Sequence, residues 1–262
     1  MKEKLVSQFV ELYADGRLPQ FIVIIGEEKN RKKRIITETM KKIPRCLMYT
    51  LPDVKADTID SMLEKSMITT IPTFYVMENG ENMHINVKNS ILKFTEEPPE
   101  NVYIILDIDY DYNLLPTLKS RATVFEMSKM TSRQLMDYAM EFDRPDVIQD
   151  VLNLADNCDD IDYLMSIDIQ KFNDFVDKVY YNLGRVSLAN ACKMTSQLAE
   201  YDFKIFLKAY LKYVPLEYTQ LITLTSGIIK DLSMKSVNKN MLIDKWIMGV
   251  RDLWNWRLIK QN

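Results

Sequence analysis

The chain has 262 residues, of which 47% are hydrophobic and 27% are charged, and its formal net charge is -3. This mixture is typical of a folded globular protein and excludes a chain that binds polyanions along its whole surface. Apolar runs such as Phe21–Ile25 are too short to span a bilayer, and the N-terminus lacks the apolar core of a signal peptide. We therefore expect a cytoplasmic protein with no membrane partner.

The first half of the chain alternates between two kinds of pattern. Short apolar, β-branched runs predict strands, and helical spacing of apolar residues between them predicts helices. The strands are expected at 21–25, 47–51, 73–77, 102–106 and 123–125. The helices are expected at 3–14, 31–42, 57–68 and 86–96. Such alternation favours a mostly parallel sheet covered by helices on both faces.

Strand patterns stop after about residue 127, and the remainder of the chain is helical in pattern. Helices are predicted at 131–140, 146–155 and 159–165, and from Ile169 onward with candidate breaks at Gly184, Pro215 and Gly227. Three tryptophans near the C-terminus have helical spacing, which favours core or subunit-interface packing over base stacking. They are Trp246, Trp254 and Trp256.

Cysteine and histidine usage predicts no metal site. Cys46, Cys158 and Cys192 lie far apart, none forms a C-x-x-C pair, and His84 is the single histidine. We interpret the cysteines as reduced structural thiols.

The most specific pattern runs from Asn89 to Leu106 and continues from Leu114 to Arg121. It contains Leu92-Lys93, Glu96-Glu97-Pro98-Pro99 and Thr117-Leu118-Lys119-Ser120-Arg121. These residues resemble the central signature of clamp-loader AAA+ subunits. The resemblance implies an α/β AAA+ P-loop-type domain at 1–127, a helical lid at 128–167 and an all-α collar bundle, for oligomerisation, at 168–262.

The loop after the first predicted strand departs from a working P-loop. A P-loop has the pattern G-x-x-x-x-G-K-[ST], in which glycines let backbone amides surround phosphate and the hydroxyl binds Mg²⁺. Here Gly26 and Lys32 are kept, but Arg31 replaces the second glycine and Lys33 replaces the hydroxyl residue. This degenerate loop predicts that the chain does not bind Mg-ATP in the usual way, so we expect no cofactor of its own.

The other elements of hydrolysis that one subunit supplies to its own nucleotide are also altered. The family's Asp-Glu pair falls at Glu78-Asn79, and Asn79 cannot act as a general base at neutral pH. The lid stretch that carries an arginine in motor subunits is Asn157–Asp162 here, and its only charged residues are acids.

The element that serves a neighbouring subunit is preserved. Ser120-Arg121 falls where the family keeps an arginine finger, and Ala122 replaces a cysteine that is not the reacting group. A broken site beside a kept finger is typical of the δ′ subunit of bacterial DNA polymerase III, and in such a subunit Arg121 would be a catalytic group acting in trans. A helix C-terminal cation is the simpler alternative for Arg121.

The resemblance implies a stator in a hetero-pentameric loader of sliding clamps on primed DNA. Its partners would be motor ATPase subunits that bind ATP, a clamp-opening subunit, the clamp itself (through residues 57–72), and primed DNA through the complex. Two other classes remain open: an ATP-binding motor-type subunit, and a loader-derived module that binds DNA or a polymerase. The basic run Lys29–Arg34 either contacts DNA phosphates or fills the empty nucleotide position by pairing with Glu27, Glu28 and Glu78.

Overall fold

The computed structural model describes residues 4–52, 59, 61–62, 69–110, 114–185, 187–232 and 238–260. The chain forms two compact units, the first made of residues 1–137 with 157–159 and the second of 138–156 with 160–262. Most of the helix predicted at 57–68, together with its expected clamp contact, lies outside the described residues. The domain boundaries at 127 and 167 stay a prediction.

The first unit is built on a five-stranded sheet of order β2-β3-β4-β1-β5. All four pairings between these strands are parallel, as the strand–helix alternation predicts. The strands are β1 (Phe21–Ile25), β2 (Leu47–Leu51), β3 (Thr73–Met77), β4 (Val102–Ile108) and β5 (Thr123–Glu126). Since parallel strands end at one edge, the segments after β1, β3 and β4 meet there.

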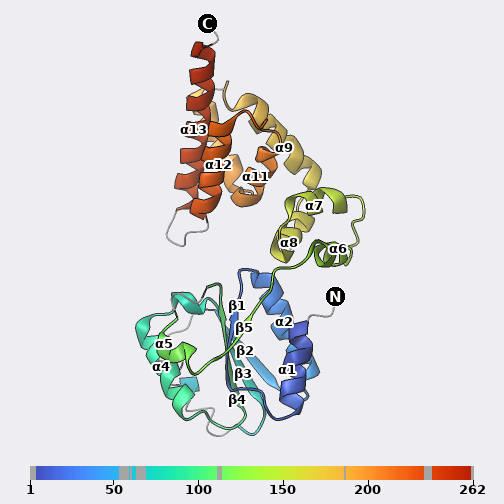
Figure 1. Cartoon of the computed structure of the whole chain (residues 1–262), viewed down its shortest axis with the longest axis vertical. Coiled ribbons are helices and arrows are strands. Elements are labelled where there is room, and N and C mark those ends of the chain that lie inside the picture. Colours follow the sequence, from blue (N-terminus) through green and yellow to red (C-terminus); the bar gives the residue numbers. More distant parts are fainter. Residues whose placement is uncertain are drawn as a thin grey trace. The chain divides into compact units, whose positions relative to one another are not determined.

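Helices cover both faces of this sheet (Figure 1). Along β1, Phe21 and Val23 join one apolar cluster while Ile22 and Ile24 join the other, because successive side chains of a strand point to opposite faces. The first cluster packs beneath α4 (Ile85–Glu96) and α5 (Pro116–Lys119). The second packs against α1 (Lys4–Ala14) and α2 (Lys29–Lys42). A short 3-10 helix, η1 (Gly80–Asn82), follows β3.

The rest of the described chain is helical. After α6 (Ser132–Ala139), the helices are α7 (Ile148–Leu154), α8 (Cys158–Ser166), α9 (Ile169–Asn182), α10 (Leu188–Ala199), α11 (Phe203–Leu211), α12 (Thr219–Leu232) and α13 (Lys239–Lys260). None of the described helices is long and apolar enough to cross a membrane.

The core of the second unit gathers around Trp246, which is fully buried on α13. Its indole Nε1 donates to Thr225 Oγ1 on α12 at 3.0 Å, and the rings of Phe206 and Tyr210 on α11 meet it edge-on. This placement fits the predicted packing role of the tryptophan. The predicted break at Gly227 is wrong, because this glycine lies inside α12, where one glycine costs only about 1 kcal/mol.

Candidate functional site

The loop after β1 is too short to surround a phosphate. Only Gly26, Glu27 and Glu28 separate β1 from α2, which begins at Lys29 rather than at Arg31 as predicted. The amide of Lys32 already donates to Glu28 O at 3.0 Å, and the amide of Gly26 donates to Ile108 O at 3.0 Å. These two backbone donors are therefore used within the fold and are not available to a phosphate.

Lys32 is fully buried and directed at the end of β4. Its Nζ donates to Ile108 O at 3.0 Å and to Asp109 Oδ1 at 3.1 Å, and it also forms an ion pair with Asp107. A lysine ammonium has three donors, so these three oxygens account for all of them. In this arrangement Lys32 has no donor left for a β or γ phosphate.

Arg31, which replaces the second P-loop glycine, is also buried. Its Nη1 donates to Glu28 Oε1 at 2.8 Å and to Ser128 O at 2.9 Å. The basic run is thus divided: Arg31 and Lys32 pair inside the unit, while Lys33 is exposed. Of the acids expected to pair with the run, Glu28 binds Arg31, whereas the partners of Lys32 are Asp107 and Asp109.

Glu78 and Asn79 follow β3, at the edge where the loop after β1 also lies. The amide of Glu78 donates to Leu51 O at 3.1 Å. Asn79 has a left-handed backbone with φ of 54°, and its Oδ1 accepts from Lys29 Nζ at 3.0 Å. The structure therefore places the predicted degenerate pair beside the basic run, where Asn79 satisfies one donor of Lys29.

One small hollow lies at this edge of the sheet. A hollow of about 40 Å³ is lined by Lys33, Thr37, Glu78 and Asp107 together with other residues of α2, β2 and β3. Such a volume holds a few waters, whereas a site for a drug-sized ligand or nucleotide needs about 300 Å³ or more. This hollow is therefore too small to hold a nucleotide.

Asp159 is a further acidic residue at this site. From the sequence, the stretch that contains it shows only that the arginine of motor subunits is missing. Its carboxylate accepts from the amide of Asn30, in the first turn of α2, at 3.1 and 3.3 Å. Burial raises the pKa of Asp159 above its usual range, although the amides of Asn30, Arg31 and Lys29 act in the opposite direction. The available signal was charge: Glu28 pairs with Arg31, whereas Lys32 takes its acids from positions 107 and 109, far along the chain.

Arg121 lies just after α5, away from these buried pairs in the sequence, and its side chain is 40% exposed. Its Nη1 donates to Thr117 O at 3.2 Å, and its Nη2 lies 3.8 Å from Glu96 Oε1. Ser120 Oγ donates to the same Thr117 carbonyl at 3.0 Å. These contacts of Arg121 are with exposed groups, so the guanidinium can leave them at little cost.

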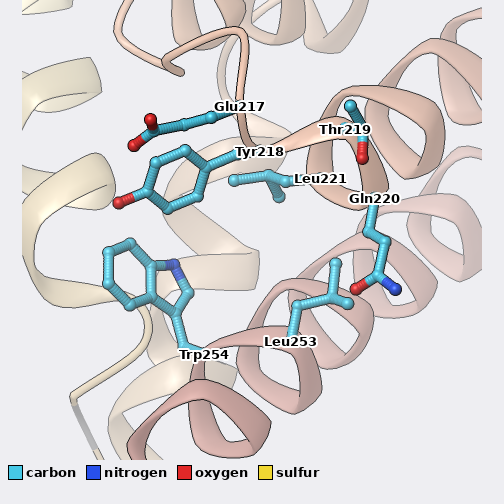
Figure 2. A pocket seen from close by; sticks show the side chains of 7 residues that line it. All are labelled: Glu217, Tyr218, Thr219, Gln220, Leu221, Leu253 and Trp254. Atoms are coloured by element: carbon cyan, nitrogen blue, oxygen red, sulfur yellow. The ribbon is translucent and has the colours of Figure 1, made fainter. Parts of the chain in front are cut away.

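The second unit holds a separate pocket of about 230 Å³ between α12 and α13 (Figure 2). The rings of Tyr218 and Trp254 lie side by side in it with centroids 6.3 Å apart. Among the described residues that line it, Glu217 is the only charged one. Because a polyphosphate is bound by cationic side chains, a pocket whose described charged residue is an acid is not suited to it.

Within the described part of the chain, no group of His, Cys, Asp and Glu residues is arranged to hold a metal ion. Between the described cysteines there is no disulfide, so Cys46 and Cys158 are both thiols. Burial raises the pKa of the Cys46 thiol.

The parallel sheet of order β2-β3-β4-β1-β5, with helices on both faces and a helical region after it, defines an AAA+-like fold. Solved structures agree. A DNA polymerase III gamma subunit-related protein from Thermotoga maritima superimposes with a TM-score of 0.58 at 14% identity, over 96% of this chain and 100% of that one. A point mutant of RuvB from Thermotoga maritima gives a TM-score of 0.53 at 13% identity, over 92% of this chain and 86% of that one.

Comparison of the sequence with known families gives a match for part of the chain. Residues 52–131 match the family described as DNA polymerase III, delta subunit, while no curated protein matches the chain. This segment contains the whole signature from Asn89 to Arg121, so the part of the chain that carries the signature is similar to the DNA polymerase III delta subunit family. The resemblance drawn from the signature is thereby confirmed. The degenerate loop at Gly26–Lys33 precedes the matched segment.

Proposed function

We propose that this chain is a δ′-like stator of a sliding-clamp loader. It does not hydrolyse ATP itself, and it donates Arg121 in trans to the ATP of a neighbouring motor subunit. The observation that carries the proposal is the contrast between two cations. Lys32 is buried with three protein oxygens, whereas Arg121 stands on the surface with weak, exposed contacts.

Physical chemistry supports this division of roles. An arginine that reaches a γ-phosphate stabilises charge that develops in the transition state, and such fingers contribute about 10³- to 10⁵-fold in rate. To do so the guanidinium must be free to leave its own subunit. The pairing of Arg121 with Glu96, whose side chain is 62% exposed, is of a kind worth at most about 1 kcal/mol.

The first test concerns Arg121. In a loader reconstituted with its motor and clamp-opening subunits, Arg121→Ala is expected to lower the clamp-stimulated ATPase of the complex by at least about tenfold. Assembly, followed by size-exclusion chromatography, should be retained. Arg133→Ala, a change to another exposed arginine of the same unit, is the matched control. Equal ATPase activity of the Arg121→Ala and Arg133→Ala complexes would show that Arg121 does not act as an arginine finger.

The second test separates this stator from a motor-type subunit, the main alternative. The isolated chain is expected to give no heat of binding with Mg-ATP in calorimetry, because Lys32 and the first-turn amides of α2 are occupied. Binding of Mg-ATP and its hydrolysis by the isolated chain would instead establish a motor-type subunit. A loader-derived DNA- or polymerase-binding module would fail to co-purify with motor and clamp-opening subunits.

A further inference from the structure

Two helix starts that lie in the first unit exchange the groups that cap them. Glu28 occupies the N-cap position of α2, but its carboxylate does not cap the first backbone amides of that helix. Its Oε2 instead accepts from the amide of Cys158, the first residue of α8, at 3.0 Å. In return, Asp159 accepts from the amide of Asn30 in α2. Each helix start is thus capped by a carboxylate that belongs to the other.

The exchange follows from the physics of helix ends. The first amides of a helix have no partner within it, and the aligned peptide dipoles give its N-terminus a partial positive charge. Two N-termini brought together would repel each other and leave amides without acceptors. Carboxylates satisfy the amides and offset the charge at the same time, as a bound phosphate does at a helix N-terminus.

Neighbouring contacts fix the geometry of the exchange. Arg31 holds the second oxygen of Glu28 at 2.8 Å and ties it to Ser128 O. Cys158 is buried, with its Sγ 3.0 Å from Met130 Sδ. Residues 157–159 belong to the first unit although residues 138–156 do not. The capping groups are therefore set by a small network and not by one flexible side chain.

We propose that Glu28 and Asp159 form an intramolecular clasp that holds residues 157–159 on the N-terminus of α2 without any nucleotide. In this clasp the two carboxylates perform the bridging role that a phosphate anion would otherwise perform. The clasp needs no bound anion, because both of its carboxylates are side chains of the chain itself. It stands independently of whether the chain acts in a clamp loader, and its test uses the full chain alone.

Amide hydrogen exchange measured by NMR on the full chain tests the clasp. Asp159→Ala is expected to speed exchange of the Asn30 amide about tenfold, the loss expected for one charge-assisted hydrogen bond. Because the caps are reciprocal, it should also speed exchange of the Cys158 amide. Glu28→Ala should have the same two effects. Exchange at Asn30 unchanged in Asp159→Ala would overturn the clasp.

Two further variants keep the outcome interpretable. Glu27→Ala removes the exposed neighbour of Glu28 and should leave both amides within about twofold of the unmodified chain. Asp159→Asn keeps the side-chain size but removes its charge, so it guards against a variant that unfolds. It should speed exchange at Asn30 about threefold while amides of β4, such as that of Ile105, stay protected. A rate at Asn30 equal to that of the unmodified chain would count against the clasp.

Discussion

At the scale of the residue, the role of a lysine depends on which oxygen atoms surround its ammonium group. Lys32 stands at the P-loop lysine position, yet its ammonium meets Asp107, Asp109 and Ile108 O. Removing one partner from a buried ion pair leaves an uncompensated charge, which is far more costly than losing an exposed one. The residue is thus expected to matter for stability.

Lys32→Met tests this expectation. It should lower the free energy of unfolding in urea by about 3–5 kcal/mol, because two largely buried carboxylates would lose their cation. The matched change Lys33→Met, at an exposed position, should alter the free energy by less than about 0.5 kcal/mol. Equal stabilities for the two variants would show that Lys32 is not structural.

At the scale of the element, helix starts in this chain are capped in two ways. Within one element, Asp168 caps α9 by accepting from the amide of Lys171 at 3.2 Å. Asp202 caps α11 in the same way, by accepting from the amide of Ile205 at 3.0 Å. Between elements, Glu28 and Asp159 cap each other's helices. A sequence pattern reveals the local caps, because the capping residue lies next to the helix.

The cap at Asp168 makes a pH-dependent prediction. Its hydrogen bond from the amide of Lys171, and to a smaller extent the nearby ammonium, lowers the pKa of Asp168 below the ordinary value of 3.8. A lowered pKa stabilises the fold above the ordinary value, and this stabilisation is lost as the pH falls through the lowered one. Thermal melts should therefore show Asp168→Asn less stable than the unmodified chain at neutral pH. The difference should shrink below pH 3.8, and a constant difference would contradict the assignment.

At the scale of the whole molecule, the chain consists of two compact units. The contacts of Lys32 with Asp107, Asp109 and Ile108 lie within the first unit. Those of Trp246 with Thr225, Phe206 and Tyr210 lie within the second. Substitutions that share no partner are expected to act independently.

A double variant tests this independence. Trp246→Ala alone should cost about 3–5 kcal/mol through lost packing and the cavity left behind. Combined with Lys32→Met, the two losses should add within about 0.5 kcal/mol, measured by urea unfolding of the single and double variants. A coupling free energy well above that value would mean that the two units unfold as one network.

Much of the fold followed from local patterns. The apolar runs at 21–25, 47–51 and 73–77 are the strands β1, β2 and β3 with the same bounds. The parallel sheet is confirmed, and the signature from Asn89 to Arg121 lies within the segment that matches the DNA polymerase III delta subunit family. The predicted break at Gly227 failed, because burial of the apolar face of α12 stabilises this helix by more than one glycine costs. Prediction also misplaced the start of α2, where a cap supplied from a distant segment lets the helix begin earlier.

The sequence by itself determined the fold class, because strand and helix periodicities depend on neighbouring residues. It also determined that the loop after β1 lacks the second glycine and the hydroxyl of a P-loop. Only the tertiary structure decided which groups surround Lys32. Asp107 and Asp109 lie more than seventy residues from Lys32, and Asp159 lies 129 residues from Asn30. Groups so distant in the chain meet only in the folded structure. Lys32 meets Asp107 and Asp109 where β4 ends, and burial there requires these charges to be paired.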